Sequence, residues 1–213
     1  GIGNAAALIT TGQDVNYTFT TVNSGTLYAG FLVNVASSQT AGDYFIHFIQ
    51  PPLTTNNSVF KGRVFIKKDQ ASNNFAFGIS KSSTAAASVA YTPFSYSLNT
   101  TYLVVLKYEF VAGTTTNDNI GIFTNPPPGA ADPASPTLSY IDNTQTDATS
   151  LGLIGLRQGT GSSAAAVQVD GIRIGQTWAD ATAMEVIVPT LSEWGLIFLG
   201  LALLAAGTFY ITR

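Results

Sequence analysis

The stretch Thr101–Val111 (TYLVVLKYEFV) carries the clearest β-strand signal in the chain. Its β-branched and aromatic residues favour extended structure. The continuous apolar run LVVL within it is expected of a strand that is buried on both sides. The stretch therefore predicts a central strand, and its neighbours in the sequence indicate what surrounds it.

Patterns with a period of two recur on both sides of this stretch, broken by turn residues about every 8–12 positions, which is typical of a β-sandwich or barrel. No helix is expected before residue 190, apart from a single turn at Asp180–Met184. The sequence predicts eleven strands in all. The other ten are Val15–Phe19, Thr26–Val35, Asp43–Ile49, Lys61–Lys67, Asn74–Ser80, Ser88–Tyr96, Asn119–Phe123, Thr137–Ile141, Leu151–Arg157 and Ala166–Ile174.

One long connection, Asn125–Pro136, contains five prolines. Proline lacks the N–H that a strand interior donates, so this segment is predicted to be a surface crossover.

The composition narrows the class of protein. The chain has 213 residues, of which only 10% are charged, against about 25% in typical soluble domains. The hydrophobic fraction of 46% excludes a disordered chain. The net charge of −3 gives no basic footprint for nucleic acid. Because the chain has no cysteine, disulfides and thiolate metal sites are excluded.

The C-terminal stretch Gly195–Ile211 (GLIFLGLALLAAGTFYI) contains no charged residue. A helix of about 18 residues is about 27 Å long, close to the thickness of a bilayer core. Thr190 and Glu193 fit a capping box at its start. We therefore predict a linker at 184–190 and an apolar, transmembrane-type helix at 191–213 that either spans a membrane or is buried in an assembly.

Small residues in the predicted helix, Gly200, Ala206 and Gly207, would permit close contact with another helix. The single basic residue at its end, Arg213, predicts that this end faces the inside of the cell and the remaining chain the outside.

The residues directly before this helix resemble the IPTL-CTERM sorting domain of bacterial surface proteins. The matching positions are Val188, Pro189, Thr190, Leu191, Trp194 and Gly195. Val188 replaces the usual isoleucine, and the usual terminal basic cluster is reduced to Arg213. The resemblance implies export to the cell surface, followed by anchoring at the envelope or processing by a sortase-like membrane enzyme.

The body of the chain is similar to laminin-G-like or concanavalin-like jelly-roll domains of secreted bacterial proteins. The similarity lies in residues 101–128, in SLGLIGLRQG (150–159) and in VDGIRIGQTWADA (169–181). It implies an all-β, antiparallel, jelly-roll-like sandwich over residues 1–183. Family members carry further strands ahead of the position that matches Gly1, so the first strands of the domain are expected to be missing.

Catalytic residues of the common hydrolases are not evident. A glycosidase needs two carboxylates about 5–9.5 Å apart. The chain has three glutamates, of which Glu193 belongs to the helix cap and Glu185 to the linker. The third, Glu109, has Lys107 and not a carboxylate two positions before it on the same strand. The single histidine, His47, lies in an alternating strand and is expected to be a packed or surface residue. We therefore expect no enzymatic activity.

Ligand sites are only weakly indicated. No cofactor is expected, although oxygen ligands for calcium are available. The candidate residues are Asp118, Asn119, Asp142 and Asp147, which could equally form turns. Three aromatic residues are candidates for contacting a glycan: Tyr91, Tyr96 and Trp178.

These features favour a non-enzymatic structural protein of the bacterial cell surface that self-assembles into a filament or layer, with copies of itself as partners. An alternative is a surface-anchored carbohydrate-binding or adhesion module whose partner is a polysaccharide. A second alternative is an accessory subunit of a larger membrane complex.

Overall fold

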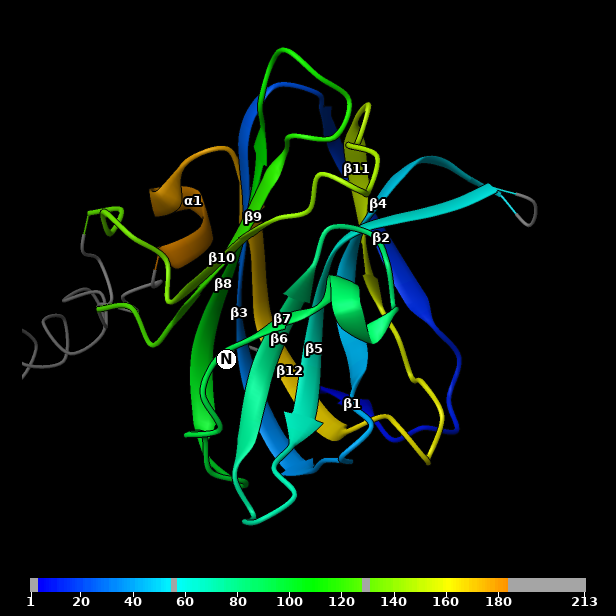
Figure 1. Ribbon diagram of the computed structural model, residues 1–213, viewed down its shortest axis with the longest axis vertical. Coiled ribbons are helices and arrows are strands. Elements are labelled where there is room, and N and C mark those ends of the chain that lie inside the picture. The colour runs from blue at the N-terminus through cyan, green and yellow to red at the C-terminus, as the bar shows by residue number, and fades with distance from the viewer. Residues whose placement is uncertain (1–3, 55–56, 128–130, 184–213) are drawn as a thin grey trace, which may run out of the picture. The chain divides into compact units, whose positions relative to one another are not determined.

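A computed structural model of the chain describes residues 4–54, 57–127 and 131–183. Within these ranges twelve strands form two antiparallel sheets that pack face to face (Figure 1). The chain divides into two compact units, of which the first ends at Ala183. The predicted linker (184–190) and apolar helix (191–213) lie outside the described residues.

Each sheet has six strands. The first sheet has the order β1 (Ala6–Leu8), β12 (Ala166–Gly175), β3 (Gly25–Ser37), β8 (Thr101–Phe110), β9 (Asn119–Thr124) and β10 (Leu138–Ile141). The second sheet has the order β2 (Val15–Val22), β11 (Leu151–Leu156), β4 (Asp43–Thr54), β5 (Asn57–Lys68), β6 (Phe75–Ser80) and β7 (Ala90–Tyr91). A short 3₁₀ helix, η1 (Ala86–Ser88), precedes β7.

The hydrophobic core lies between the two sheets. Strand β8, which was predicted to be a central strand, is an inner strand of the first sheet and pairs with β3 and β9. Val104, Leu106 and Tyr108 on β8 are fully buried in this core. Burial of alternate side chains from both sheets is what holds a sandwich together. The prediction of an antiparallel β-sandwich is therefore confirmed.

The outer face of the first sheet is partly covered by the short helix α1 (Trp178–Thr182). Thr177 and Asp180 form a capping box at its start. Trp178 packs with Tyr28 and Phe123 in a second, smaller hydrophobic cluster. The helix lies against β3 and β12. Gly30 on β3 permits this approach, because a Cβ atom there would lie 2.0 Å from the carbonyl oxygen of Ala181.

Two bulges in the second sheet change which side chains share a face. Opposite Val64 on β5, β4 carries one extra residue, so that Phe45 and Ile46 both contribute to the core. Tyr44 and His47 consequently share the outer face, although residues three apart lie on opposite faces of a regular strand.

On β5 the extra residue is Gly62, which has a φ of +56°. It places Lys61 on the core side of the sheet and Arg63 on the outer side. This bulge therefore separates two basic residues that a regular strand would hold on one face.

The remaining differences from the predicted elements are local. The predicted strand Ser88–Tyr96 is reduced to Ala90–Tyr91, and the predicted helical turn Asp180–Met184 begins two residues earlier, at Trp178. Strand β1 was not predicted. The described parts of the proline-rich segment at 125–136 contain no strand. None of the helices in the described ranges has the length and apolar character that a membrane span requires.

Candidate functional site

The outer face of the second sheet gathers basic and aromatic side chains from four strands or strand ends. We call Tyr44, His47, Arg63, Tyr91 and Arg157 the basic–aromatic face. Tyr44 and His47 come from β4, Arg63 from β5 and Tyr91 from β7, and Arg157 directly follows β11. Tyr44 and His47 are 7% and 3% exposed, and the other three are half-buried.

Two glycines provide the space in which these rings lie. Gly155 on β11 pairs with His47, and a Cβ atom there would lie 2.8 Å from the imidazole. A Cβ atom at Gly78 on β6 would lie 2.5 Å from the ring of Tyr91. Any larger residue at either position would displace the ring, so the glycines help to position the basic–aromatic face.

Tyr44 is the centre of the basic–aromatic face. The guanidinium carbons of Arg63 and Arg157 lie 4.5 Å and 4.3 Å from its ring centroid, and cation–π contacts of this kind hold both arginines in place. Its ring centroid is 5.3 Å from that of His47. Arg157 is also anchored by an ion pair with Asp43, with 2.7 Å between nitrogen and oxygen.

His47 is uncharged, and its two ring nitrogens are not used in hydrogen bonds within the described residues. Burial lowers its pKa to about 3, and the positive charges of Arg63 and Arg157 add to this effect. Neither ring nitrogen has a hydrogen-bond partner among the described residues. A neutral imidazole presents one donor and one acceptor, and in His47 both are left unused by the described residues.

Arg63 has no anionic partner within the described ranges. It forms no ion pair there, and its Nε atom is buried without a hydrogen-bond partner. Phe60 lies 5.5 Å from its guanidinium carbon and shields it from water on that side. Burial lowers the pKa of Arg63, which reflects the cost of keeping this charge out of water.

A second group of basic residues lies at one end of the sandwich. We call Lys61, Lys81, Asp118 and Asp147 the lysine cluster. The Lys81 ammonium is fully buried and donates to the carbonyls of Thr116 and Gln145 and to the carboxylate of Asp147.

Lys61 is also buried, and it donates to the carbonyl oxygen of Thr146. Burial lowers the pKa of Lys61, and the nearby charge of Lys81 lowers it further. Both lysines are thus bound by oxygen atoms of the protein itself.

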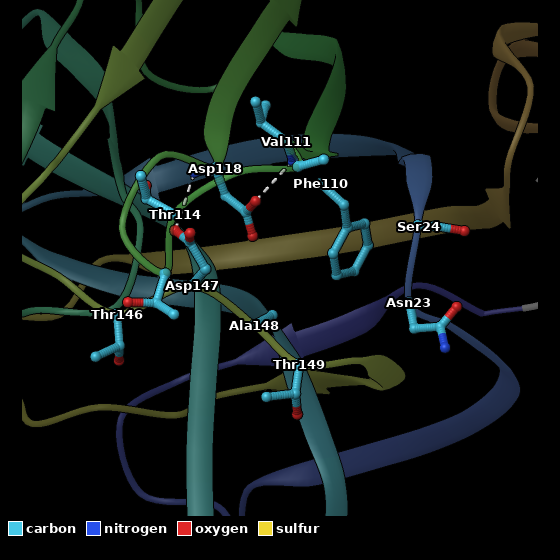
Figure 2. A pocket seen from close by; sticks show the side chains of 12 residues that line it. Asn23, Ser24, Phe110, Val111, Thr114, Asp118, Thr146, Asp147, Ala148 and Thr149 are labelled. Carbon is cyan, nitrogen blue, oxygen red and sulfur yellow. Dashed lines mark hydrogen bonds between the residues drawn. The ribbon is translucent and has the colours of Figure 1, made fainter.

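The end of the sandwich also contains a pocket of about 400 Å³, lined in part by Phe110, Asp118 and Asp147 (Figure 2). Its two carboxylates are already engaged. Asp118 accepts from the Tyr108 hydroxyl and the Val111 N–H, the second of which is dashed in Figure 2. Asp147 accepts from Lys81 and from the backbone N–H groups of residues 117 and 118. The two carboxylates at this end of the sandwich therefore stabilise the fold.

The calcium candidates from the sequence are not all in one place. Asp118 and Asp147 belong to the lysine cluster. Asp142 accepts from the N–H and hydroxyl of Thr144, while Asn119 contacts Glu109 and Ser139. No group of three or more metal-binding side chains occurs among the described residues.

The three predicted glycan-contacting aromatics are separated by the fold. Tyr91 lies on the basic–aromatic face. Tyr96 packs against Phe75, Phe77 and Tyr102. Trp178, the first residue of α1, is buried against the other sheet.

The arginines of the basic–aromatic face were not predicted from the sequence. One signal was present: Arg63, Phe65 and Lys67 alternate within a predicted strand, which places two cations on one face. Arg157 could not have been found in this way, because it follows a strand more than a hundred residues from Tyr44 in the sequence.

Comparison with known protein families finds the IPTL-CTERM motif at residues 188–212. This match confirms the predicted C-terminal sorting signal and supports an exported protein that is anchored at the cell surface. No curated protein sequence matches the chain.

Solved structures share the fold of the sandwich. A mutant of the alginate lyase Aly36B in complex with an alginate tetrasaccharide matches with a TM-score of 0.53 at 14% identity, covering 80% of this chain and 79% of that one. Aly36B without ligand matches with a TM-score of 0.52 at 13% identity and the same coverage. An endo-β-1,4-glucuronan lyase from the fungus Trichoderma reesei matches with a TM-score of 0.46 at 12% identity, covering 85% and 90%.

These matches contradict two expectations from the sequence. The prediction of a structural protein that self-assembles into a filament or layer is wrong, as is the prediction of no enzymatic activity. Both relied on the absence of hydrolase residues, whereas the sandwich shares its fold with a solved alginate lyase. The carbohydrate-binding alternative fits better, and the laminin-G-like resemblance stays a prediction.

Proposed function

We propose that the sandwich binds an acidic polysaccharide through the basic–aromatic face. The observation that carries this proposal is Arg63, a half-buried cation without an anionic partner among the described residues, beside the neutral, unpaired imidazole of His47. A cation held in such surroundings is destabilising unless an anion joins it.

A sugar carboxylate is the anion that suits this position best. Guanidinium and carboxylate groups form paired, charge-assisted hydrogen bonds. The neighbouring rings of Tyr44 and Phe60 offer apolar surface to the carbon atoms of a sugar, and His47 offers a donor and an acceptor. A few polar groups set among aromatic side chains are typical of a ligand site.

Two comparisons support the same proposal. The fold is similar to that of a lyase solved with an alginate tetrasaccharide, although likeness of fold is only an analogy for function. The sorting motif supports a location at the cell surface, where polysaccharides are encountered.

The proposal is tested by titrating the full-length protein with alginate oligosaccharides and with uncharged cello-oligosaccharides. We expect binding of the acidic series only, and at least tenfold weaker binding by Arg63→Met, or about 1.4 kcal/mol. Lys107→Met is the matched control, because it removes the same charge from the other sheet. Equal losses in both variants, or no binding of any acidic oligosaccharide, would overturn the proposal.

A second candidate function is cleavage of the bound polymer by β-elimination. The surroundings of His47 favour it: its ring centroid lies 5.3 Å from that of Tyr44, and neither ring nitrogen has a hydrogen-bond partner among the described residues. In this reaction His47 takes the proton from the carbon that bears the carboxylate, and Arg63 stabilises the negative charge that develops there. A carbon–carbon double bond then forms, the bond to the next sugar breaks, and the Tyr44 hydroxyl gives a proton to the leaving oxygen.

Cleavage is detected by the ultraviolet absorbance of the unsaturated product. We expect His47→Gln and Tyr44→Phe each to lower the rate at least a hundredfold, in line with the usual contribution of general acid–base groups. Binding should change little, because glutamine keeps a donor and an acceptor and phenylalanine keeps the ring. Binding without any product in the wild-type protein would exclude cleavage of that polymer and leave the binding proposal intact.

A further inference from the structure

A second cation lies on the same strand and the same face as Arg63. Lys67 follows Arg63 by four residues on β5, and the rise of about 3.3 Å per residue separates their Cα atoms by about 13 Å. Phe65 lies between them and contacts the rings of Tyr44 and Tyr91. A row of cation, aromatic ring and cation thus runs along the strand.

Lys67 is held in a defined position. Its Nζ atom lies 5.3 Å from the ring centroid of Tyr91. A Cβ atom at Gly42 would lie 3.0 Å from the Cβ of Lys67 and 3.2 Å from the Tyr91 hydroxyl, so both side chains pack closely against this glycine. The φ of Gly42 is +74°, a conformation that favours glycine.

Among the described residues, Lys67 has no anionic partner of its own. Asp43, near the start of β4, is engaged by Arg157 and Ser163. No carboxylate in the described part of the chain pairs with Lys67. The ammonium group therefore remains available to an anion from outside, with the Tyr91 ring beside it as apolar surface.

From these contacts we infer that Lys67 and Tyr91 form a second carboxylate subsite. The ligand is then a chain of acidic sugars that places one carboxylate at Arg63 and a later one at Lys67, and not a single sugar acid. This inference rests on the proposed function, because it requires the first carboxylate to bind at Arg63. Linking two contacts in one ligand makes the second contact intramolecular, so affinity is expected to rise with chain length.

The test is a titration of the full-length protein with alginate oligosaccharides from the single sugar to the hexasaccharide. We expect affinity to increase at least tenfold once the ligand spans both subsites. Lys67→Met should abolish this increase and leave the affinity for short ligands unchanged, whereas Lys67→Arg should retain it. Lys68→Met is the matched control, because it removes the same charge from the adjacent position on the strand and should retain the increase.

The outcomes separate this inference from the proposed function. If no acidic oligosaccharide of any length binds, the proposed function fails and the second subsite with it. If short ligands bind through Arg63 but affinity does not rise with length, or if Lys67→Met and Lys68→Met behave alike, only the second subsite is overturned. Tyr91→Ala provides an independent check, since loss of the ring should also remove the increase.

Discussion

Lys61 and Arg63 lie only two residues apart on β5, yet they belong to two different kinds of basic cluster. Lys61, on the core side, is bound by an oxygen of Thr146, and its neighbour Lys81 is bound by two carbonyls and a carboxylate. Arg63, on the outer side, has a buried nitrogen without a partner in the described ranges. The bulge at Gly62 separates the two environments.

The comparison contrasts a charge that is compensated within the fold with one that we propose is compensated by a ligand. Both clusters contain more than one cation, but the two lysines are fully buried and the two arginines are half-buried. In the lysine cluster the chain provides the compensating oxygen atoms. On the basic–aromatic face Asp43 compensates Arg157, whereas no carboxylate in the described part of the chain pairs with Arg63. Burial alone therefore does not distinguish the two clusters, whereas the state of their hydrogen bonds does.

The largest effect on stability is expected from Lys81→Met. The substitution leaves Asp147, whose side chain is 11% exposed, without its cation, together with two unpaired carbonyls. Loss of one partner from a buried ion pair costs about 3–5 kcal/mol of unfolding free energy, which urea denaturation measures.

The control for Lys81→Met is Lys107→Met, which removes a lysine whose ion pair with Glu109 is more exposed. Such surface pairs contribute about 0–1 kcal/mol. If both variants lose the same amount, the lysine cluster does not hold the fold together.

The next largest effect on stability is expected from the pH dependence that His47 introduces. The pKa of His47 is about 3 in the folded protein and 6.5 in the unfolded chain. Between these values only the unfolded chain takes up the proton, so stability falls as the pH drops from 6.5 towards 3. At pH 5 the loss is roughly 2 kcal/mol, because one pKa unit corresponds to 1.36 kcal/mol.

His47→Gln isolates this contribution, since other groups that titrate are common to both proteins. Denaturation at pH 7 and pH 5 should show a smaller decrease for the variant than for the wild type. Parallel decreases would mean that His47 is protonated in the folded protein, and the proposed general base would then lose its support.

A third effect tests the position of the imidazole. Gly155→Ala places a methyl group 2.8 Å from the His47 ring and 3.1 Å from Ile49. Such overpacking typically costs about 1–3 kcal/mol, and we expect weaker binding of acidic oligosaccharides as well. Gly161→Ala is the control, because its nearest contact would be 3.7 Å away. Equal thermal stability of the two variants would argue that the imidazole is free to move.

The smallest effect on stability is expected from Arg63→Met, the substitution that should most affect binding. Replacing a buried charge that lacks a partner by an apolar side chain is neutral or mildly stabilising, so we expect the unfolding free energy to stay within about 1 kcal/mol of the wild type. A loss above about 2 kcal/mol in urea denaturation would mean that Arg63, like Lys81, mainly stabilises the fold.

The fold could largely be predicted from the sequence, because its signals are local. Period-two alternation and turn residues identified most strands, including β8, without knowledge of their partners. The exceptions are elements that depend on distant residues. Strand β1 has three residues and forms only by pairing with β12, far along the chain. The predicted strand 88–96 is limited to two residues that pair with β6.

The site could not be predicted in the same way. A strict period of two places Tyr44 and His47 on opposite faces and Lys61 and Arg63 on the same face, and both assignments are reversed by bulges. Arg157 reaches Tyr44 from a segment 113 residues away. Paired carboxylates, whose absence led to the expectation of no enzymatic activity, are not what an elimination requires, since it needs only a cation, a base and an acid.

The position of β12 has a mechanical consequence for an anchored protein. The sorting motif follows α1, so tension from the cell surface enters the sandwich through the end of β12, which lies between β1 and β3 in the first sheet. A polymer on the basic–aromatic face would pull on the second sheet instead. The load must then cross the hydrophobic core that joins the sheets. Under such pulling, the rate of forced unfolding limits the lifetime of the attachment.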